Sequence, residues 1–213
     1  MKRIFDIENP LMQTLSVIAD MLVLNLLTIL CSIPLITMGA AVTAMNDVVI
    51  RILYRTEDTS ISRGYFRAFR SNLKKGSLFG LLLLLAAALL YLDYMAALRF
   101  CPPLRFGIAA LAVLLLALAL YSFALLARYE NGLFPTLRNA AMLAVGYFPK
   151  TLGMLLFCTA FWMLCIHFIR WGAPILLMFG LSLPAYVCLL LIKTVFAQLE
   201  KTDNQIDQKG AET

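Results

Sequence analysis

Residues 77–92 (SLFGLLLLLAAALLYL) and 108–127 (IAALAVLLLALALYSFALLA) contain no charged side chain, and they decide the fold class. About 20 mostly apolar helical residues are needed to cross the hydrocarbon core of a bilayer. In lipid a helix satisfies its backbone hydrogen bonds internally, which an open loop does not. These two runs therefore predict membrane-spanning helices in an all-α fold.

The composition extends this prediction to the whole chain. The 213 residues are 62% hydrophobic and 14% charged. A soluble domain has about 45–50% apolar and about 25% charged residues, so both deviations indicate lipid. The length leaves no room for a large soluble domain. We expect one membrane domain over residues 1–197 and a polar, disordered cytoplasmic tail over 198–213.

The apolar runs predict a polytopic bundle of about six spans. These spans are about 15–33, 36–53, 77–98, 106–127, 151–169 and 174–197. The first two are hard to divide, because Pro34 lies in one long apolar run. Proline removes a helical hydrogen bond and disfavours helix in the residue before it. Pro34 therefore marks either a tight turn between two crossings or a kink in one helix, which would leave five.

The distribution of positive charge favours six spans with both termini in the cytoplasm. Fifteen of the 18 lysines and arginines then fall in the predicted cytoplasmic parts, 1–14, 51–76, 128–150 and 193–213. Cytoplasmic loops carry such an excess of lysine and arginine. The net charge of +6 is thus explained by orientation and anionic headgroups. We expect no nucleic-acid partner, because the sequence contains no recognition module.

Residues 60–75 (SISRGYFRAFRSNLKK) have the sharpest local pattern. Apolar and cationic side chains recur on different sides of a helix, as in helices that lie in the membrane interface. We expect this amphipathic helix to contact anionic lipid headgroups or a cytoplasmic partner through Arg63, Tyr65, Phe66, Arg67, Phe69, Arg70 and Lys74. The sequence leaves open whether the helix is a membrane-resting linker or a docking surface.

Polar side chains within spans are costly in lipid and are therefore candidates for function. Asn25, Asn46, Asp47 and Asp93 are the candidates for a polar interior. Asp47 also precedes Arg51 by four residues, so the two can pair on one helix face.

Catalytic signatures are missing from the sequence. It has no P-loop, HExxH, GxSxG or CxxC pattern and a single histidine, His167. Most of the five cysteines lie in apolar runs, where cysteine behaves as a small hydrophobe. Cys158 and Cys165 share a helix face near His167, but a metal site would need further ligands. We therefore expect no enzymatic activity, no cofactor and no metal site.

Two further motifs carry a family resemblance. The first is Pro34-x-x-Thr37-x-Gly39-Ala40-Ala41-x-Thr43-Ala44, and the second is Tyr65-Phe66-Arg67-Ala68-Phe69-Arg70-x-Asn72. With these motifs the chain resembles the YesL family of bacterial membrane proteins, which carries a domain of unknown function. The resemblance spans about residues 1–197, and its specific part is the first motif. Family members often have a tryptophan in the first span, where this chain has none.

The resemblance implies the bacterial plasma membrane and a genomic setting near carbohydrate uptake, including ABC sugar transporters. It carries no catalytic residues over to this chain. The residues themselves give the first motif a packing role, because small residues let helices approach closely.

Three functions remain open. The first is an accessory component beside a sugar ABC transporter, suggested by the resemblance, the lack of an ATPase motif and the docking-like segment 60–75. The second is a stand-alone small-solute transporter, whose path the four polar candidates would line. The third is a membrane-bound regulatory or structural interaction protein. The solute, the partner and the oligomeric state are not encoded in a recognisable pattern.

Overall fold

The computed structural model describes residues 10–54, 60–100, 103–129, 132–167, 174 and 176–195. Every regular element in these ranges is a helix, which confirms the all-α prediction. The predicted tail 198–213 lies outside the described residues.

Within these ranges, five helices are long and apolar enough to cross a membrane. They are Leu15–Ser32, Leu35–Tyr54, Ile61–Arg99, Leu104–Arg128 and Phe148–His167, and a shorter apolar helix, Ser182–Val195, follows them. These helices fit a multi-pass membrane protein. The exact number of crossings and the sidedness of the termini stay predictions.

Pro34 separates two helices rather than kinking one. Helix α1 (Pro10–Ser32) ends just before Pro34, and a short 3-10 turn, η2 (Leu35–Thr37), leads into α2 (Met38–Tyr54). The hydroxyl of Thr37 donates to the Cys31 carbonyl at 2.8 Å. It thereby satisfies a carbonyl that the end of α1 leaves without a helical partner.

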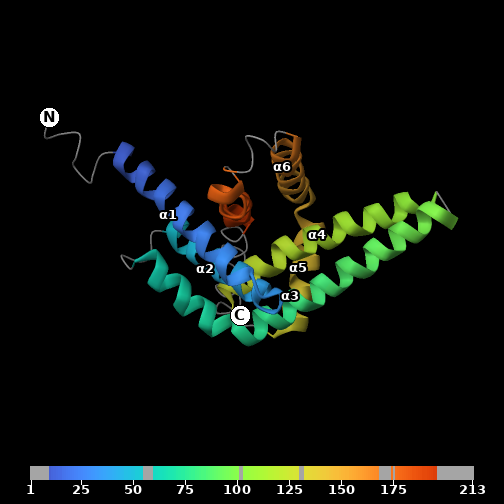
Figure 1. The fold of residues 1–213 in the computed structure, drawn as a ribbon, viewed down its shortest axis with the longest axis horizontal. Helices are drawn as coiled ribbons and strands as arrows, with labels where there is room; N and C mark the ends of the chain where they lie inside the picture. The colour runs from blue at the N-terminus through green and yellow to red at the C-terminus, as the bar shows by residue number, and fades with distance from the viewer. Residues whose placement is uncertain are drawn as a thin grey trace, which may run out of the picture.

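Helix α3 (Ile61–Phe100) is one continuous helix of 40 residues. This corrects the expectation of an interfacial helix over 60–75 separate from a span over 77–98. The segment contains no proline, and Gly76 at the junction weakens a helix without ending it. Figure 1 shows that α3 curves near its middle, where the polar segment meets the apolar one. At about 1.5 Å per residue, α3 is roughly twice as long as a hydrocarbon core is thick.

The predicted connection 128–150 contains a helix that the sequence analysis missed. Helix α4 (Leu104–Arg128) is followed by α5 (Leu133–Gly146) and, after a turn at Tyr147, by α6 (Phe148–His167). Pro149 explains the turn, because proline donates no backbone hydrogen bond and is tolerated in a first helical turn.

Side chains inside the bundle provide hydrogen bonds at the break between α5 and α6. The hydroxyl of Thr151 donates to the Ala144 carbonyl at 2.9 Å and lies 3.1 Å from the hydroxyl of Tyr121 on α4. Both side chains are buried, so lipid does not reach the opened backbone.

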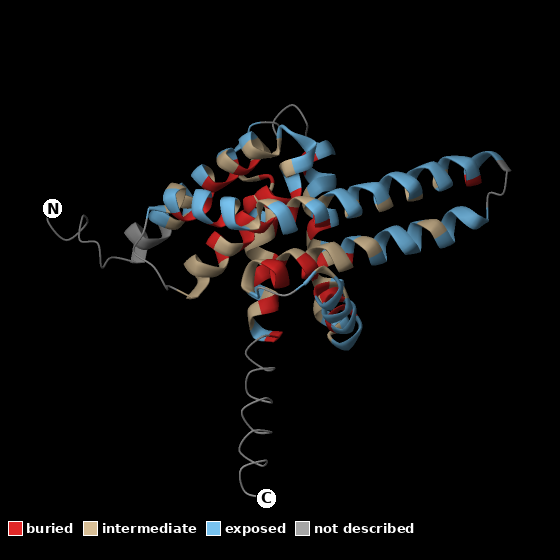
Figure 2. Ribbon diagram, turned by 90° about the horizontal axis from the view of Figure 1, so that it is seen from below, coloured by how far each residue is buried: buried red, intermediate tan, exposed pale blue. Residues whose placement is uncertain are grey.

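The core and the exposed surface occupy different parts of the molecule. The largest fully buried side chains include Leu24, Val49, Tyr65, Tyr121, Met154 and Ile192, which come from α1, α2, α3, α4, α6 and the helix Ser182–Val195. Figure 2 shows buried residues concentrated in the bundle, while the α3–α4 hairpin projects from it with mostly exposed residues. We call residues 81–99 and 104–116 of this hairpin the projecting arm.

Helices α2 and α3 cross with their backbones in contact. A Cβ added to Gly80 would lie 2.5 Å from the Cα of Gly39, and one added to Gly76 would lie 2.9 Å from the Cα of Ala40. Thr43 donates its hydroxyl to the Gly39 carbonyl at 2.7 Å within α2. The first motif thus provides the small residues that this close approach requires.

Candidate functional site

A polar cavity lies between α2, α3 and α4, and we call it the basic cleft. Its volume is about 390 Å³. The charged and polar side chains that line it are Asp47, Arg51, Arg67, Ser71, Asn72, Lys75, Arg128 and Tyr129.

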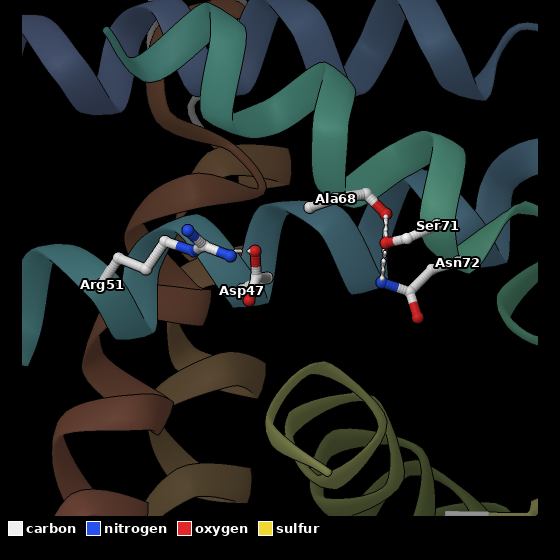
Figure 3. A network of polar contacts seen from close by, with 5 residues as sticks. All are labelled: Asp47, Arg51, Ala68, Ser71 and Asn72. Carbon is white, nitrogen blue, oxygen red and sulfur yellow. Dashed lines mark hydrogen bonds and ion pairs between the residues drawn. The ribbon is translucent and has the colours of Figure 1, made fainter. Parts of the chain in front are cut away.

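Two local contacts organise this cleft. On α2, the Nε of Arg51 donates to Oδ2 of Asp47 at 3.0 Å, which is the pairing that the four-residue spacing predicts. On α3, Nδ2 of Asn72 donates to the Ala68 carbonyl at 3.0 Å, and the Ser71 hydroxyl donates to the same carbonyl at 2.9 Å. Figure 3 shows these two groups on their separate helices. Each of these contacts joins residues of one helix.

Cationic side chains outnumber carboxylates among the described residues that line the cleft. Arg51, Arg67, Lys75 and Arg128 line it, and Asp47 is the one carboxylate among the described lining residues. Asp47 is already paired with Arg51 and is partly shielded from solvent.

A second group of cations lies at the neighbouring helix ends. The Nη1 of Arg128 donates to the Tyr54 hydroxyl at 2.8 Å, and its guanidinium lies 5.0 Å from the centroid of the Tyr54 ring. The Nζ of Lys193 lies 4.8 Å from the same centroid and donates to the Leu53 carbonyl at 2.9 Å. The C-terminal ends of α2, α4 and the helix Ser182–Val195 therefore meet on one side of the bundle.

Asn25 is fully buried and forms hydrogen bonds to both sides of a helix break in residues 176–195. Its Nδ2 donates to the Leu177 carbonyl at 2.7 Å, and its Oδ1 accepts from the backbone N–H groups of Leu181 at 2.8 Å and Ser182 at 3.2 Å. These bonds satisfy backbone groups on both sides of the turn at Gly180. The side chain thus replaces helical hydrogen bonds inside the membrane domain.

Asn46 lines a second cavity, which we call the central cavity. This cavity has a volume of about 400 Å³ and lies between α2, α4, α6 and the helix Ser182–Val195. Its other lining residues include Phe123, Cys158, Trp162 and Cys188. Asn46 is 6% exposed, so its amide is one of few polar groups in a mostly apolar space.

The thiols of Cys158 and Cys188 lie side by side in the central cavity, with their Sγ atoms 3.5 Å apart. The sequence pattern instead indicated that Cys158 and Cys165 share a helix face near His167. In the part of the chain that the structure describes, no three His, Cys, Asp or Glu side chains form a group that could hold a metal ion.

The four candidates for a polar interior do not share one path. Asn25 lies at the helix break, Asn46 at the central cavity and Asp47 at the basic cleft. Asp93 is exposed on the projecting arm.

Part of the predicted docking helix, residues 60–75, is buried in the bundle and part is exposed. Tyr65 is fully buried, its hydroxyl lies 3.5 Å from the Ala41 carbonyl, and its ring stacks on Phe69 with centroids 6.2 Å apart. Contrary to expectation, Tyr65 is therefore unavailable to lipid or to a partner. Of the seven residues expected to dock, five are exposed, namely Arg63, Phe66, Arg67, Arg70 and Lys74.

Comparison with known proteins agrees with the family resemblance. Residues 21–94 match a family described as "Protein of unknown function, DUF624". The match covers the second half of α1, all of α2 and most of α3, and so includes the α2–α3 crossing. No curated protein and no solved structure matches the chain.

Proposed function

We propose that this protein is a non-enzymatic accessory component of the bacterial plasma membrane that works beside a second membrane protein. The projecting arm is the observation that carries the proposal. Leu82, Leu85 and Leu92 on α3 and Leu111 and Leu114 on α4 each expose more than half of their surface. The bundle of this chain leaves them uncovered.

The arm has a groove that suits a transmembrane helix. This groove has a volume of about 670 Å³, and its lining includes the small residues Ala87, Ala109 and Ala112 of the arm. Association of helices in lipid depends on close packing, and small residues permit it. The occupant that we propose is a transmembrane helix of the partner.

Exposed cations on α3 indicate which kind of surface the partner should have. Arg63, Arg70 and Lys74 are exposed on the first half of α3, which continues directly into the arm. A partner that lies along α3 would complement these cations with an acidic cytoplasmic surface. The family resemblance makes a sugar ABC permease the first candidate, since this chain has no nucleotide-binding motif of its own.

Crosslinking in native membranes, followed by affinity purification and mass spectrometry, tests this function. We expect permease subunits with the wild type. The double variant Arg63→Glu, Arg70→Glu should recover about tenfold less of them, because like charges would face each other. The control Arg99→Glu, Arg105→Glu makes the same charge change at the opposite end of the hairpin and should recover them normally. Recovery of this protein alone at high crosslinking yield would exclude the accessory function.

A stand-alone transporter is the second candidate, favoured by the central cavity beside the break at Gly180. Broken helices near the membrane midplane often hold substrates in transporters. In liposomes, Asn46→Leu should then abolish sugar flux, whereas Thr159→Val should preserve it, because that hydroxyl bonds its own helix. An inactive wild type, or an active Asn46→Leu variant, would rule this candidate out.

A further inference from the structure

Two buried thiols meet at the central cavity, and the accessory function makes no use of them. The Sγ atoms of Cys158 on α6 and Cys188 on the helix Ser182–Val195 lie 3.5 Å apart. The two residues are 7% and 3% exposed and stand 30 positions apart in the sequence. The sequence has no CxxC pattern, so only the fold brings these two sulfur atoms together.

We propose that Cys158 and Cys188 are a site of reversible oxidation, where hydrogen peroxide forms a disulfide that ties α6 to the helix Ser182–Val195. This modification site goes beyond the accessory function and does not depend on it. The S–S bond of a disulfide is about 2.0 Å long, so the two sulfur atoms have a short distance left to close. Rotation of the two side chains can provide this approach while both helices stay intact.

The oxidation balances with hydrogen peroxide as the oxidant. One thiol attacks the peroxide, the O–O bond breaks, and a sulfenic acid and one water molecule form. The second sulfur then displaces the sulfenic hydroxyl group, which leaves with the remaining thiol proton as a second water molecule. In total, two S–H bonds and one O–O bond break, and one S–S bond and two O–H bonds form. Two electrons pass from sulfur to oxygen.

The central cavity has room for this oxidant beside both sulfur atoms. Its volume is about 400 Å³, and Cys158 and Cys188 both line it. Hydrogen peroxide is only slightly larger than a water molecule, which occupies about 30 Å³ in the liquid. Asn46 and Thr159 add polar groups to the same lining. A small neutral oxidant therefore fits where the two thiols meet.

The surroundings of the pair favour a neutral product. None of the described residues that line the central cavity is charged. A monovalent soft cation such as Cu(I), held by two thiolates, would leave a net negative charge there, and burying an unpaired charge is costly. A disulfide carries no charge. Because the thiolate is the attacking form of cysteine, the same surroundings slow the first step, and the test therefore uses an excess of peroxide.

The disulfide would add a covalent link to a helix that Asn25 already holds. Asn25 bonds the backbone on both sides of the break at Gly180, which precedes the helix Ser182–Val195. The link from Cys158 to Cys188 reaches the same helix from α6. A disulfide stabilises a fold mainly by restricting the unfolded chain. The oxidised protein should therefore unfold at a higher temperature than the reduced protein.

The experiment begins with native membranes that contain the full-length protein. Hydrogen peroxide is added in excess and removed with catalase, and free thiols are then alkylated under denaturing conditions before peptide mass spectrometry. We expect a peptide crosslinked between Cys158 and Cys188 that dithiothreitol separates again. In a second sample, purified without denaturation, oxidation should raise the Tm by roughly 5–10 °C.

Cys165 provides the matched control, because it is also buried on α6 but is not among the residues that line the central cavity. Cys165→Ala should keep the crosslink and the rise in Tm, whereas Cys158→Ala and Cys188→Ala should lose both. The wild type alone already tests the proposal. It is overturned if peroxide oxidises glutathione added to the same membranes but yields no Cys158–Cys188 peptide, if Cys165 crosslinks in equal yield, or if the oxidised protein keeps the Tm of the reduced one.

Discussion

The two halves of α3 share one continuous helix but have opposite surroundings. Tyr65, Ala68, Gly76 and Phe79 are buried in the first half, whereas Ala97 is the one buried residue between positions 81 and 99. The second half is by far the more apolar, with its unbroken run of leucines and alanines.

In water the more apolar half would be the buried one. In a membrane the order reverses, because lipid tails solvate leucine as well as protein does. Burial then follows shape and polar contacts, and the first half of α3 has both, through its glycines and through Tyr65. The uncovered second half is available to a partner.

The largest effect should come from separating α2 and α3 at their crossing. In Gly39→Leu the new side chain would meet the backbone of Gly76 and Gly80, so the helices must move apart. We expect a loss of about 3 kcal/mol in the free energy of unfolding, at the upper end for overpacking. Equilibrium unfolding in mixed micelles measures it.

Gly107 on the projecting arm provides the control, because nothing lies within 4 Å of a Cβ added there. Gly107→Ala should be neutral or stabilising by up to about 1 kcal/mol, since alanine favours the helix. Equal stability of Gly39→Leu and Gly107→Ala would show that α2 and α3 do not touch as described.

A smaller loss of stability should follow from removing the hydrogen bonds that Asn25 makes at the helix break near Gly180. Asn25→Leu removes the bonds to Leu177, Leu181 and Ser182, and we expect a cost of about 2 kcal/mol because buried backbone groups lose their partners. Amide hydrogen exchange should rise most at residues 176–182. Thr28→Val is the control, because Thr28 is equally buried but donates its hydroxyl to the carbonyl of Leu24 on its own helix. If both variants exchange alike, Asn25 has no special role at the break.

The smallest effects on stability are expected from truncating one side chain in each half of α3, and they compare the two halves directly. Phe79 is 3% exposed and packs edge-on against Phe123, with ring centroids 5.7 Å apart. Phe79→Ala should cost roughly 1–2 kcal/mol, below the usual cost of such a substitution because lipid can refill the space. Leu89 is 55% exposed, and Leu89→Ala should change the stability of the purified protein by less than about 0.5 kcal/mol. Similar losses from both would contradict the contrast in burial.

The apolar runs predicted where helices lie but not where they are continuous. Pro34 correctly marked a possible turn, since proline acts locally. The sequence pattern distinguishes the amphipathic segment 60–75 from the span 77–98, but without a proline between them the helix continues through Gly76. Helix α5 was missed, although Thr136, Ala140 and Ala144 recur every four residues and are buried. That recurrence of small residues was the available signal.

The polar residues of the candidate sites could be selected from the sequence, but their partners could not. Asn25 bonds residues more than 150 positions away, which no local pattern encodes. Arg128 and Lys193 went unrecognised as a cluster around Tyr54, although basic residues at helix C-termini are a general sign of such contacts. The Asp47–Arg51 pair was predictable, because one helix turn contains it.

The most direct test of the uncovered arm is site-specific photocrosslinking in native membranes. A photoreactive residue at Ala87 or Ala112 lies in the groove, whereas one at Met163 lies on an exposed face of α6. We predict a discrete crosslink to one other membrane protein from both groove positions, at least about tenfold above that from Met163. Lipid adducts alone at all three positions, or a crosslink only to a second copy of this chain, would contradict the account.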